Sequence, residues 1–194
     1  MRVLIGCEES GKVRQAWRSR GHDAWSCDIV AARDRSPHHL QMDVMDAIER
    51  GPWDIIILHP DCSAMACSGN RWYGRGMPMH SKRIAAVEWT VRLWDKAKKF
   101  ARVGCALENP KGVLWTALGV VPQYIHPHQF GHGETKETGI LAHNLPRLVP
   151  TNNVPGREHR VWKMGPSPTR KRDRSETYQG IADAFAEQWS RSLD

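Results

Sequence analysis

A cysteine and an acidic residue each lie at the end of an apolar run, and their side chains suit nucleophilic chemistry. Cys62 follows the run DIIILHPD (54–61), and Glu108 lies within CALENP (105–110). A cysteine with a lowered pKa is a good nucleophile, and a carboxyl group with a raised pKa can donate a proton. If the two runs are neighbouring strands, the pair suits thiolate addition to a pyrimidine ring that takes up a proton at nitrogen. The alternative is that Cys62 is a small apolar residue of the core.

A second group of polar residues follows the first two apolar runs and suits an adenosine ligand. The turn 6–11 lets the backbone approach a ligand, but it lacks the pattern G-x-G-x-x-G. It also carries Glu8 and Glu9, which disfavour a pyrophosphate. Asp28 is placed to accept hydrogen bonds from ribose hydroxyls, and Asp43 from an adenine amino group. The structural alternatives are that Asp28 starts a turn and that Asp43 caps the following helix.

The loop 63–80, directly after Cys62, has residue types that contact nucleic acid. It carries arginines for phosphate, Trp72 and Tyr73 for base stacking, and glycines that allow movement. If a base is flipped out of its stack, such a loop can close on it. The alternative is an ordinary surface loop, and within it Cys67 is expected to be structural.

The elements that must position these residues alternate between strand and helix. Apolar runs and amphipathic patterns predict strands at 2–6, 23–30, 53–60 and 105–110 and helices at 10–21, 43–51 and 81–104. This alternation predicts an α/β fold with a mainly parallel sheet and helices on both faces. Ligands of such sheets bind outside the carboxyl ends of the strands, so the residues above should line one crevice. In the last of these helices, Lys82 and Arg83 are expected on the solvated face.

The second half of the chain is less regular and strongly basic. We expect two more strands at 123–131 and 138–145, and an amphipathic closing helix capped by Thr177. Between them, the proline-rich segment 146–176 holds eight basic and three acidic residues, which accounts for most of the net charge of +7. A basic surface of this kind favours a polyanionic partner.

Length and composition exclude several classes of protein. The 194 residues suit one compact domain, and no apolar stretch approaches the roughly 20 residues that span a bilayer. The amino terminus lacks the pattern of a signal peptide, and five cysteines without a C-x-x-C pair indicate reduced thiols in a cytoplasm. No metal site is expected, because His126, His128 and His132 have a spacing that matches no usual zinc pattern.

Four motifs in order carry a resemblance to a known family. IGCEESG, CDI, LHPDC and LENP together resemble the catalytic core of the DNA cytosine C5-methyltransferases. The sequence is most similar to short, mostly phage-encoded members with HPPC, SGNRW, ENP and a terminal TYQGIA. The resemblance covers residues 2–145 and 175–190. It implies a Rossmann-like, S-adenosylmethionine-dependent methyltransferase fold, with 1–194 a single domain and 146–176 a basic insertion in place of a large target-recognition domain.

The resemblance also implies roles for individual residues. Cys62 would attack C6 of a cytosine, Glu108 would engage N3, and Asn109 would position Glu108 or the cysteine loop. Lys136 lies in a segment where the family has an arginine. The residues implied to bind S-adenosylmethionine are Gly6, Glu8, Ser10, Gly11, Asp28, Asp43 and Pro60. Those implied to bind the substrate are Ser68, Asn70, Arg71, Trp72 and Lys136.

The function implied is methyl transfer to C5 of cytosine in DNA through a covalent Cys62 adduct, in the cytoplasm, or in the host cytoplasm if the protein is phage-encoded. Asp61 stands where the family has proline, and a carboxylate beside a thiol raises its pKa. One alternative is C5 modification of a free cytidine nucleotide, because no large recognition domain is present. The other is a DNA-binding protein that keeps the fold without turnover.

Overall fold

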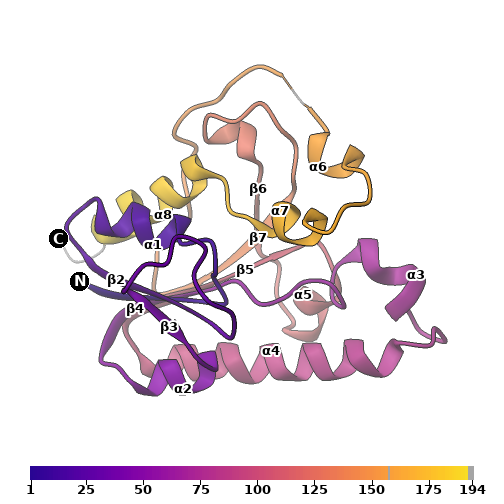
Figure 1. Cartoon of the computed structure of the whole chain (residues 1–194), viewed down its shortest axis with the longest axis horizontal. Coiled ribbons are helices and arrows are strands. Elements are labelled where there is room, and N and C mark those ends of the chain that lie inside the picture. The colour runs from indigo at the N-terminus through magenta and orange to yellow at the C-terminus, as the bar shows by residue number, and fades with distance from the viewer. Residues whose placement is uncertain (157, 192–194) are drawn as a thin grey trace.

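The computed structural model describes residues 1–156 and 158–191, which form an α/β fold around one sheet (Figure 1). The strand order is β3-β2-β1-β4-β5-β7-β6. Neighbours are parallel from β3 to β5, whereas β7 runs antiparallel to both β5 and β6. The strands are β1 (Arg2–Gly6), β2 (Asp23–Asp28), β3 (His39–Gln41), β4 (Trp53–Leu58), β5 (Ala101–Pro110), β6 (Gln123–Ile125) and β7 (Thr138–His143). The predicted α/β class with a mainly parallel sheet is confirmed.

Helices cover both faces of this sheet. Among the described residues, no helix is long and apolar enough to cross a membrane. The α-helices are α1 (Lys12–Arg18), α2 (Val44–Glu49), α3 (Asn70–Tyr73), α4 (His80–Phe100), α5 (Val113–Ala117), α6 (Arg160–Lys163), α7 (Arg170–Ser175) and α8 (Gln179–Ser190). Two 3-10 turns, η1 (Cys67–Gly69) and η2 (Pro127–Gln129), lie in the loops.

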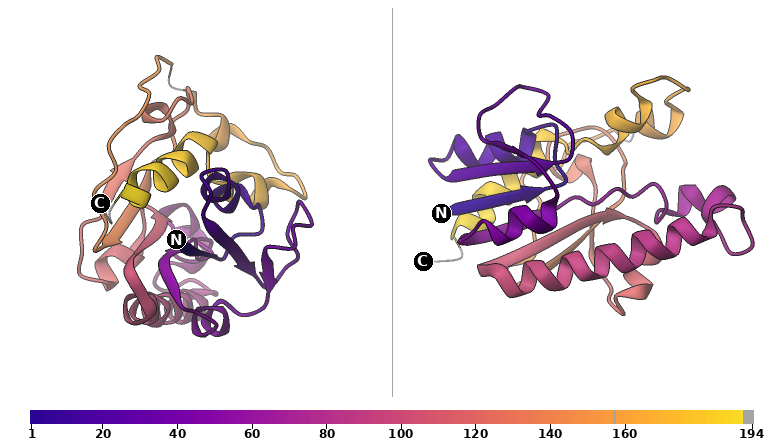
Figure 2. Two further views of the ribbon diagram at one scale, coloured as in Figure 1. Left: turned by 90° about the vertical axis from the view of Figure 1, so that its left-hand side faces the viewer. Right: turned by 60° about the horizontal axis from the view of Figure 1, so that its bottom comes forward.

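The central strands β1 and β4 are buried on both faces, which explains their continuous apolar sequence. Val3, Ile55 and Ile57 belong to the cluster formed with α1 and α8. Ile56 and Leu58 belong to the cluster formed with α2 and α4. Figures 1 and 2 show these two pairs of helices on opposite sides of the sheet. The strands therefore place their carboxyl ends at the rim of a packed core.

The closing helix α8 packs beside α1, although the two are at opposite ends of the chain (Figure 1). The rings of Phe185 and Trp189 stack with their centroids 4.5 Å apart, and both side chains are fully buried. Trp189 Nε1 also donates a hydrogen bond to the carbonyl of Pro146, at 3.0 Å. This contact anchors the start of the basic segment to the core.

Several element boundaries differ from the expected ones. The helix expected over 81–104 ends at Phe100, because the next residues join β5, where Ala101 pairs with Trp53. The strand expected over 123–131 ends at Ile125, before a 3-10 turn. The sequence analysis missed β3, a short edge strand that pairs with β2.

The cap expected for the closing helix is also wrong. Tyr178, not Thr177, is the N-cap residue of α8, and it makes no side-chain capping hydrogen bond. The amide of Gly180 instead donates to His132 Nε2 at 3.0 Å. A side chain from a distant loop therefore satisfies one of the free amides at the start of this helix.

The basic segment 146–176 contains α6 and α7 and lies on the same side of the molecule as α3 (Figure 1). Isolated bridges pair Phe130 with Asn152 and Glu134 with Glu158, which tie the segment to the loop before β7. Arg157, which belongs to this segment, and residues 192–194 of the expected closing helix lie outside the described residues.

We expect Phe185→Ala to lower the free energy of unfolding by about 3–5 kcal/mol, because it leaves a cavity between α1, α8 and the sheet. Urea unfolding followed by tryptophan fluorescence and circular dichroism measures the change. Val121→Ala is the control, since Val121 is 89% exposed and its truncation should change stability by less than about 0.5 kcal/mol. An equal effect of the two substitutions would contradict the packing described for α8.

Candidate active site

The register of three parallel strands aligns the polar residues that follow them. Gly6 pairs with Leu58, and Leu58 pairs with Leu107. His59 and Glu108 therefore follow at the same level, and the amide of His59 donates to the carbonyl of Gly6 at 2.9 Å. The chain runs outward from β1 to β2 and β3 and then returns to β4 on the other side of β1, so the strand order reverses at this point. Ligands of open α/β sheets bind at such a switch point.

Asn109 holds the loop that carries Cys62. Its Nδ2 donates to the carbonyl of Pro60 at 3.0 Å, and the residue is 1% exposed. The carbonyl of Cys62 in turn accepts hydrogen bonds from the amides of Met65 and Ala66, at 3.0 and 2.8 Å. The thiol thus sits at the start of a tight turn that is tied to the end of β5.

Arg83, on α4, supports the same loop from behind. Its guanidinium donates from Nε to the carbonyl of Ala64 at 2.6 Å and from Nη2 to that of Ala66 at 3.4 Å. Sequence analysis expected Arg83 on the solvated face, and this was wrong, because the residue is 7% exposed. Helical spacing carries the missed signal, since Arg83 lies four residues before Val87 and seven before Thr90, on the inward stripe.

The Cys62 thiol has a raised pKa, contrary to the expected activation. Burial, followed by the negative charges of Glu108 and Asp61, raises the pKa of Cys62 to about 11, against the opposing positive charge of Lys136. The carboxylate of Asp61 turns back onto Ser63, and its Oδ1 accepts from the amide at 3.0 Å and from the hydroxyl at 2.6 Å. In this structure the thiol at neutral pH is protonated.

Glu108 also differs from expectation, in the opposite direction. Burial alone would raise the pKa of Glu108, but a hydrogen bond from His59 and the positive charges of His59 and Lys136 outweigh it and lower the pKa. His59 Nδ1 lies 3.3 Å from Glu108 Oε2. The expected raised pKa is therefore wrong for this state of the protein, and Glu108 is a carboxylate at neutral pH.

Lys136 is brought to this site from the loop before β7. Its charge acts on the pKa of both Cys62 and Glu108. The Lys136 ammonium lies 3.4 Å from the carbonyl of Glu176 and 5.9 Å from the centre of the Tyr178 ring. The end of the basic segment and the start of α8 thus hold a cation beside the thiol and the acid.

The turn after β1 serves mainly to begin α1. Glu8 is 5% exposed, and its carboxylate accepts from the amide of Val13 at 2.7 Å, from that of Arg14 at 3.3 Å and from the hydroxyl of Ser10 at 3.2 Å. Gly11 is the N-cap residue, with a φ of 76° that favours glycine. Burial raises the pKa of Glu8, against His59 and the two amides. These contacts satisfy the free amides of the first helical turn.

Glycine at position 6 is required by packing rather than by a turn. A Cβ atom there would lie 2.5 Å from Val44 Cγ2 and 2.9 Å from Leu58 Cδ2. The side chain at this position is therefore limited to hydrogen by the approach of α2 to the end of β1.

Asp28 and Asp43 flank the end of β1 beside Cys7. Asp28 Oδ1 accepts from the amide of Val30 at 3.2 Å, and Asp43 Oδ1 caps α2 by accepting from Met45 at 2.7 Å. Both structural alternatives therefore hold here. Burial, and then the charges of Asp28, Cys27, Asp43 and Asp61, raise the pKa of Cys7, a residue that the sequence analysis did not single out. Burial likewise raises the pKa of Asp28, against hydrogen bonds from its neighbouring amides.

This group has the side-chain chemistry that suits an adenosine-containing ligand. Ile29 and Val30, which follow Asp28, are 74% and 48% exposed. The site thus combines carboxylates that can accept from ribose hydroxyls with apolar side chains that can cover adenine. Its clustered acids suit a ligand without phosphates.

The residues expected to bind the substrate lie in two places. Lys136 is at the site, whereas Ser68, Asn70, Arg71 and Trp72 lie on η1 and α3, beyond the rim of the sheet (Figure 1). All four of these side chains are exposed, and the Arg71 guanidinium lies 4.9 Å from the Trp72 ring centre. η1 adjoins the Cys62 loop, since a Cβ atom at Gly69 would lie 2.5 Å from the carbonyl oxygen of Ser63.

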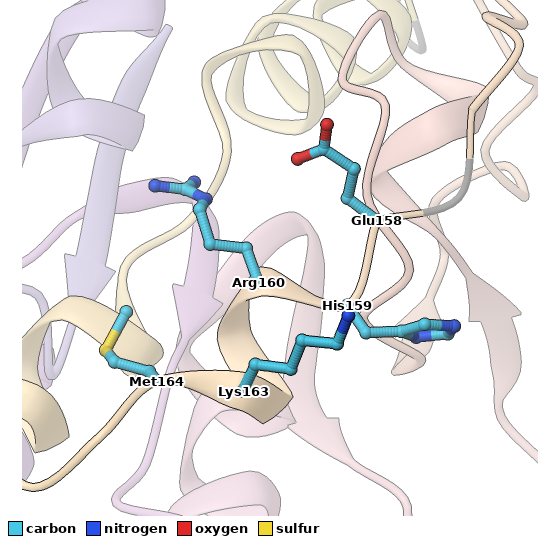
Figure 3. Close-up of a pocket in the computed structure, with 5 residues that line it drawn as sticks. All are labelled: Glu158, His159, Arg160, Lys163 and Met164. Atoms are coloured by element: carbon cyan, nitrogen blue, oxygen red, sulfur yellow. The ribbon is translucent and has the colours of Figure 1, made fainter.

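Two hollows lie near the site. One of about 440 Å³ is lined by Glu158, His159, Arg160, Lys163 and Met164, on α6 and at both of its ends (Figure 3). The other, of about 240 Å³, lies between the Cys62 loop and α4, and residues including Asp61, Tyr73, Lys82 and Trp89 line it. The basic lining of the first hollow and the aromatic lining of the second suit phosphate and base contacts respectively.

The three histidines considered as zinc ligands do not form a ligand set. The rings of His126 and His128 stack 5.3 Å apart, while His132 accepts a hydrogen bond from Gly180. Across residues 1–156 and 158–191, no three metal-ligating side chains lie together in a way that could hold an ion.

We expect Arg83→Met to lower the free energy of unfolding by about 1–3 kcal/mol, because it leaves two loop carbonyls without their donor. Chemical unfolding in urea measures the loss. Arg92→Met, on the exposed side of the same helix, should change stability by less than about 0.5 kcal/mol. If both variants behave alike, Arg83 does not support the loop.

We expect Glu8→Gln to change how stability depends on pH. A raised pKa means that the folded protein binds the Glu8 proton more tightly than the unfolded chain. The contribution of Glu8 is therefore largest below the pKa of the unfolded chain and is lost as pH rises through the raised value. Relative to the unmutated protein, Glu8→Gln should gain stability as pH rises from 4 to 8. If the free energies of unfolding of the two proteins change by the same amount between pH 4 and pH 8, Glu8 does not have a raised pKa in the folded protein.

The fold is shared with solved methyltransferase structures. A protein described as a candidate DNA modification methyltransferase, encoded within an E. coli prophage, aligns with a TM-score of 0.55 at 13% identity, over 80% of this chain and 52% of that chain. The Entamoeba histolytica methyltransferase EhMeth aligns with a TM-score of 0.56 at 11% identity, over 79% of this chain and 57% of that chain. This chain thus spans little more than half the length of these structures.

No protein-family model and no curated protein matches the sequence. At identities this low, similarity to solved structures establishes the fold alone. The chain therefore has the Rossmann-like α/β fold that these two structures share.

Proposed function

We propose that this protein transfers a methyl group from S-adenosylmethionine to C5 of cytosine in DNA, through a covalent adduct of Cys62 at C6. The observation that carries the proposal is the convergence of Cys62, Glu108, Asn109 and Lys136 at the carboxyl ends of β4 and β5. The fold and its likeness to solved methyltransferases support the same conclusion.

Asp28, Asp43 and the apolar Ile29 would hold S-adenosylmethionine at the ends of β1 and β2. When bound, this cofactor supplies an electrophilic methyl group. Glu8, Ser10, Gly11 and Gly6 act indirectly, since they begin α1 and allow α2 to pack at the rim of this site. Pro60 contributes its carbonyl to the bond with Asn109.

The protonation states of Cys62 and Glu108 suggest where the thiol proton goes when the sulfur attacks the base. Cys62 holds a proton at neutral pH, and Glu108 lacks one. When the sulfur attacks C6, the Cys62 proton passes to Glu108 and from there to N3, so the bound ring gains one S–C bond and one proton. Lys136 stabilises the negative charge, which passes from the carboxylate to the sulfur with the first proton transfer and returns to the carboxylate once N3 is protonated. After C5 has received the methyl group, a base removes the C5 proton and the Cys62 sulfur is eliminated. The N3 proton returns through Glu108 to that sulfur, which restores the thiol and releases the neutral product.

The nucleic acid would be bound by two basic surfaces. Arg71 and Trp72 on α3 form one, and Arg160 and Lys163 beside the larger hollow form the other. Because Arg71 and Trp72 on α3 are exposed and lie beyond the turn that Arg83 ties down, we propose that the rest of the loop 63–80 closes when a flipped base enters.

Cys62→Ser should abolish methyl transfer and also covalent trapping by DNA that contains 5-fluorocytosine, because an alcohol is a far weaker nucleophile at C6. Mass spectrometry of nucleosides, after incubation of DNA with protein and isotope-labelled S-adenosylmethionine, measures the product. Cys67→Ser is the matched control, since Cys67 is an exposed thiol five residues away, and it should retain activity.

Two outcomes would replace this proposal with another. Label that appears only when free cytidine monophosphate is supplied would favour a nucleotide-modifying enzyme. DNA binding without trapping by the unmutated protein would favour a binding protein that uses a methyltransferase fold, for which Asp61 and the raised pKa of Cys62 are the supporting observations.

A further inference from the structure

His59 lies beside the Glu108 carboxylate at the switch point of the sheet. Its ring nitrogen Nδ1 is 3.3 Å from Glu108 Oε2, on the neighbouring strand β5. Its charge also lowers the pKa of Glu8, on the turn after β1. The His59 side chain is 10% exposed, and the ring of Phe185 on α8 lies 6.4 Å away, centre to centre. The imidazole is thus enclosed on three sides by the sheet and α8.

The contact with Glu108 determines which ring nitrogen carries hydrogen. A carboxylate can only accept, so Nδ1 must be the donor. Nε2 is buried, and no described residue forms a hydrogen bond with it. In a histidine with a purely structural role, a buried second ring nitrogen would normally form a hydrogen bond as well. The ring is therefore held by its bond to Glu108 rather than by a network of its own.

We propose that His59 is a positioning residue that keeps Glu108 ionised and oriented, so that Glu108 can accept the thiol proton of Cys62 and pass it to the ring nitrogen of the base. This inference rests on the proposed function for its catalytic consequence, but the His59–Glu108 contact itself does not. His59 forms no bond to substrate in this scheme. It donates Nδ1–H to Oε2, and the carboxylate keeps lone pairs with which it can accept the thiol proton.

The other charged groups around the pair are consistent with this role. Lys136 faces Glu108 and Cys62 from the loop before β7, and the hydroxyl of Thr138, on β7, also bonds Glu108. Arg14 on α1 acts on Glu8 rather than on Glu108. His59 donates to Glu108 from the residue directly after β4, and its removal should raise the pKa of the carboxyl group.

The test uses two substitutions. His59→Phe keeps an aromatic ring but removes the donor, whereas His59→Asn places an amide nitrogen near the position of Nδ1 without a charge. Carbon-13 NMR of labelled glutamate, with the Glu108 signal assigned by Glu108→Gln, follows the carboxyl group as pH changes. We expect the pKa of Glu108 to rise in His59→Phe and to rise less in His59→Asn.

The rate of trapping by DNA that contains 5-fluorocytosine is the second readout. The rate should fall about 10- to 100-fold in His59→Phe, as expected for loss of a hydrogen bond to a charged group. His59→Asn should recover most of the rate. His22→Asn, at the opposite end of the strands, is the control and should leave both readouts unchanged.

The two readouts separate this inference from the proposed function. An unchanged Glu108 titration in His59→Phe overturns the inference, even if the protein is an active methyltransferase. A shifted titration in a protein that never traps DNA supports the contact and overturns the proposed function. If His59→Phe does not fold, the comparison of His59→Asn with the unmutated protein still decides, because loss of the imidazole contact should raise the pKa of Glu108 and an unchanged titration overturns the inference.

Discussion

The candidate site depends on the parallel register of β1, β4 and β5. Because Gly6, Leu58 and Leu107 lie side by side, the chain leaves all three strands at one level and its polar residues meet there. These strands alternate their side chains between two buried clusters, so a slip of one residue would turn the apolar set of a strand to the wrong face. The core and the site therefore share one constraint, and packing holds the reactive groups in place.

Buried polar side chains fix the loop that carries Cys62 at the end of these strands. Asn109 bonds the carbonyl of Pro60, and Arg83 bonds the carbonyls that follow Cys62. Hydrogen bonds inside a protein are strong, and their loss leaves unpaired groups in a medium of low dielectric constant. The Cys62 turn is thus rigid, whereas α3, next along the chain, projects beyond the sheet (Figure 1). A fixed nucleophile beside a projecting loop suits a reaction that must first admit a large substrate.

The charges at the site keep its thiol inactive in this state. Cys62 has a raised pKa and Glu108 a lowered one, so the single proton of this pair resides on Cys62 at neutral pH. Lys136, held by contacts with Glu176 and Tyr178, stabilises the negative form of either partner. Glu176 also pairs with Lys12 and Arg33, which connects the end of the basic segment to the turns beside the proposed cofactor site. Glu176 would therefore link the proposed nucleic-acid surface, the Cys62–Glu108 pair and the proposed cofactor site through its ion pairs and its contact with Lys136.

The sequence by itself determined the α/β class, the central strands and the position of Cys62, Glu108 and Asn109 at strand ends. These follow from continuous apolar runs, which are typical of strands that are buried on both faces of a sheet. Tertiary structure decided the pKa directions of Cys62 and Glu108 and the inward position of Arg83, because these depend on charges and carbonyls contributed by other elements. It also decided the end of α4 and the position of β3, where pairing with a neighbouring strand outweighs local pattern. The sequence identifies the reactive groups, and the surroundings that set their protonation exist only in the folded chain.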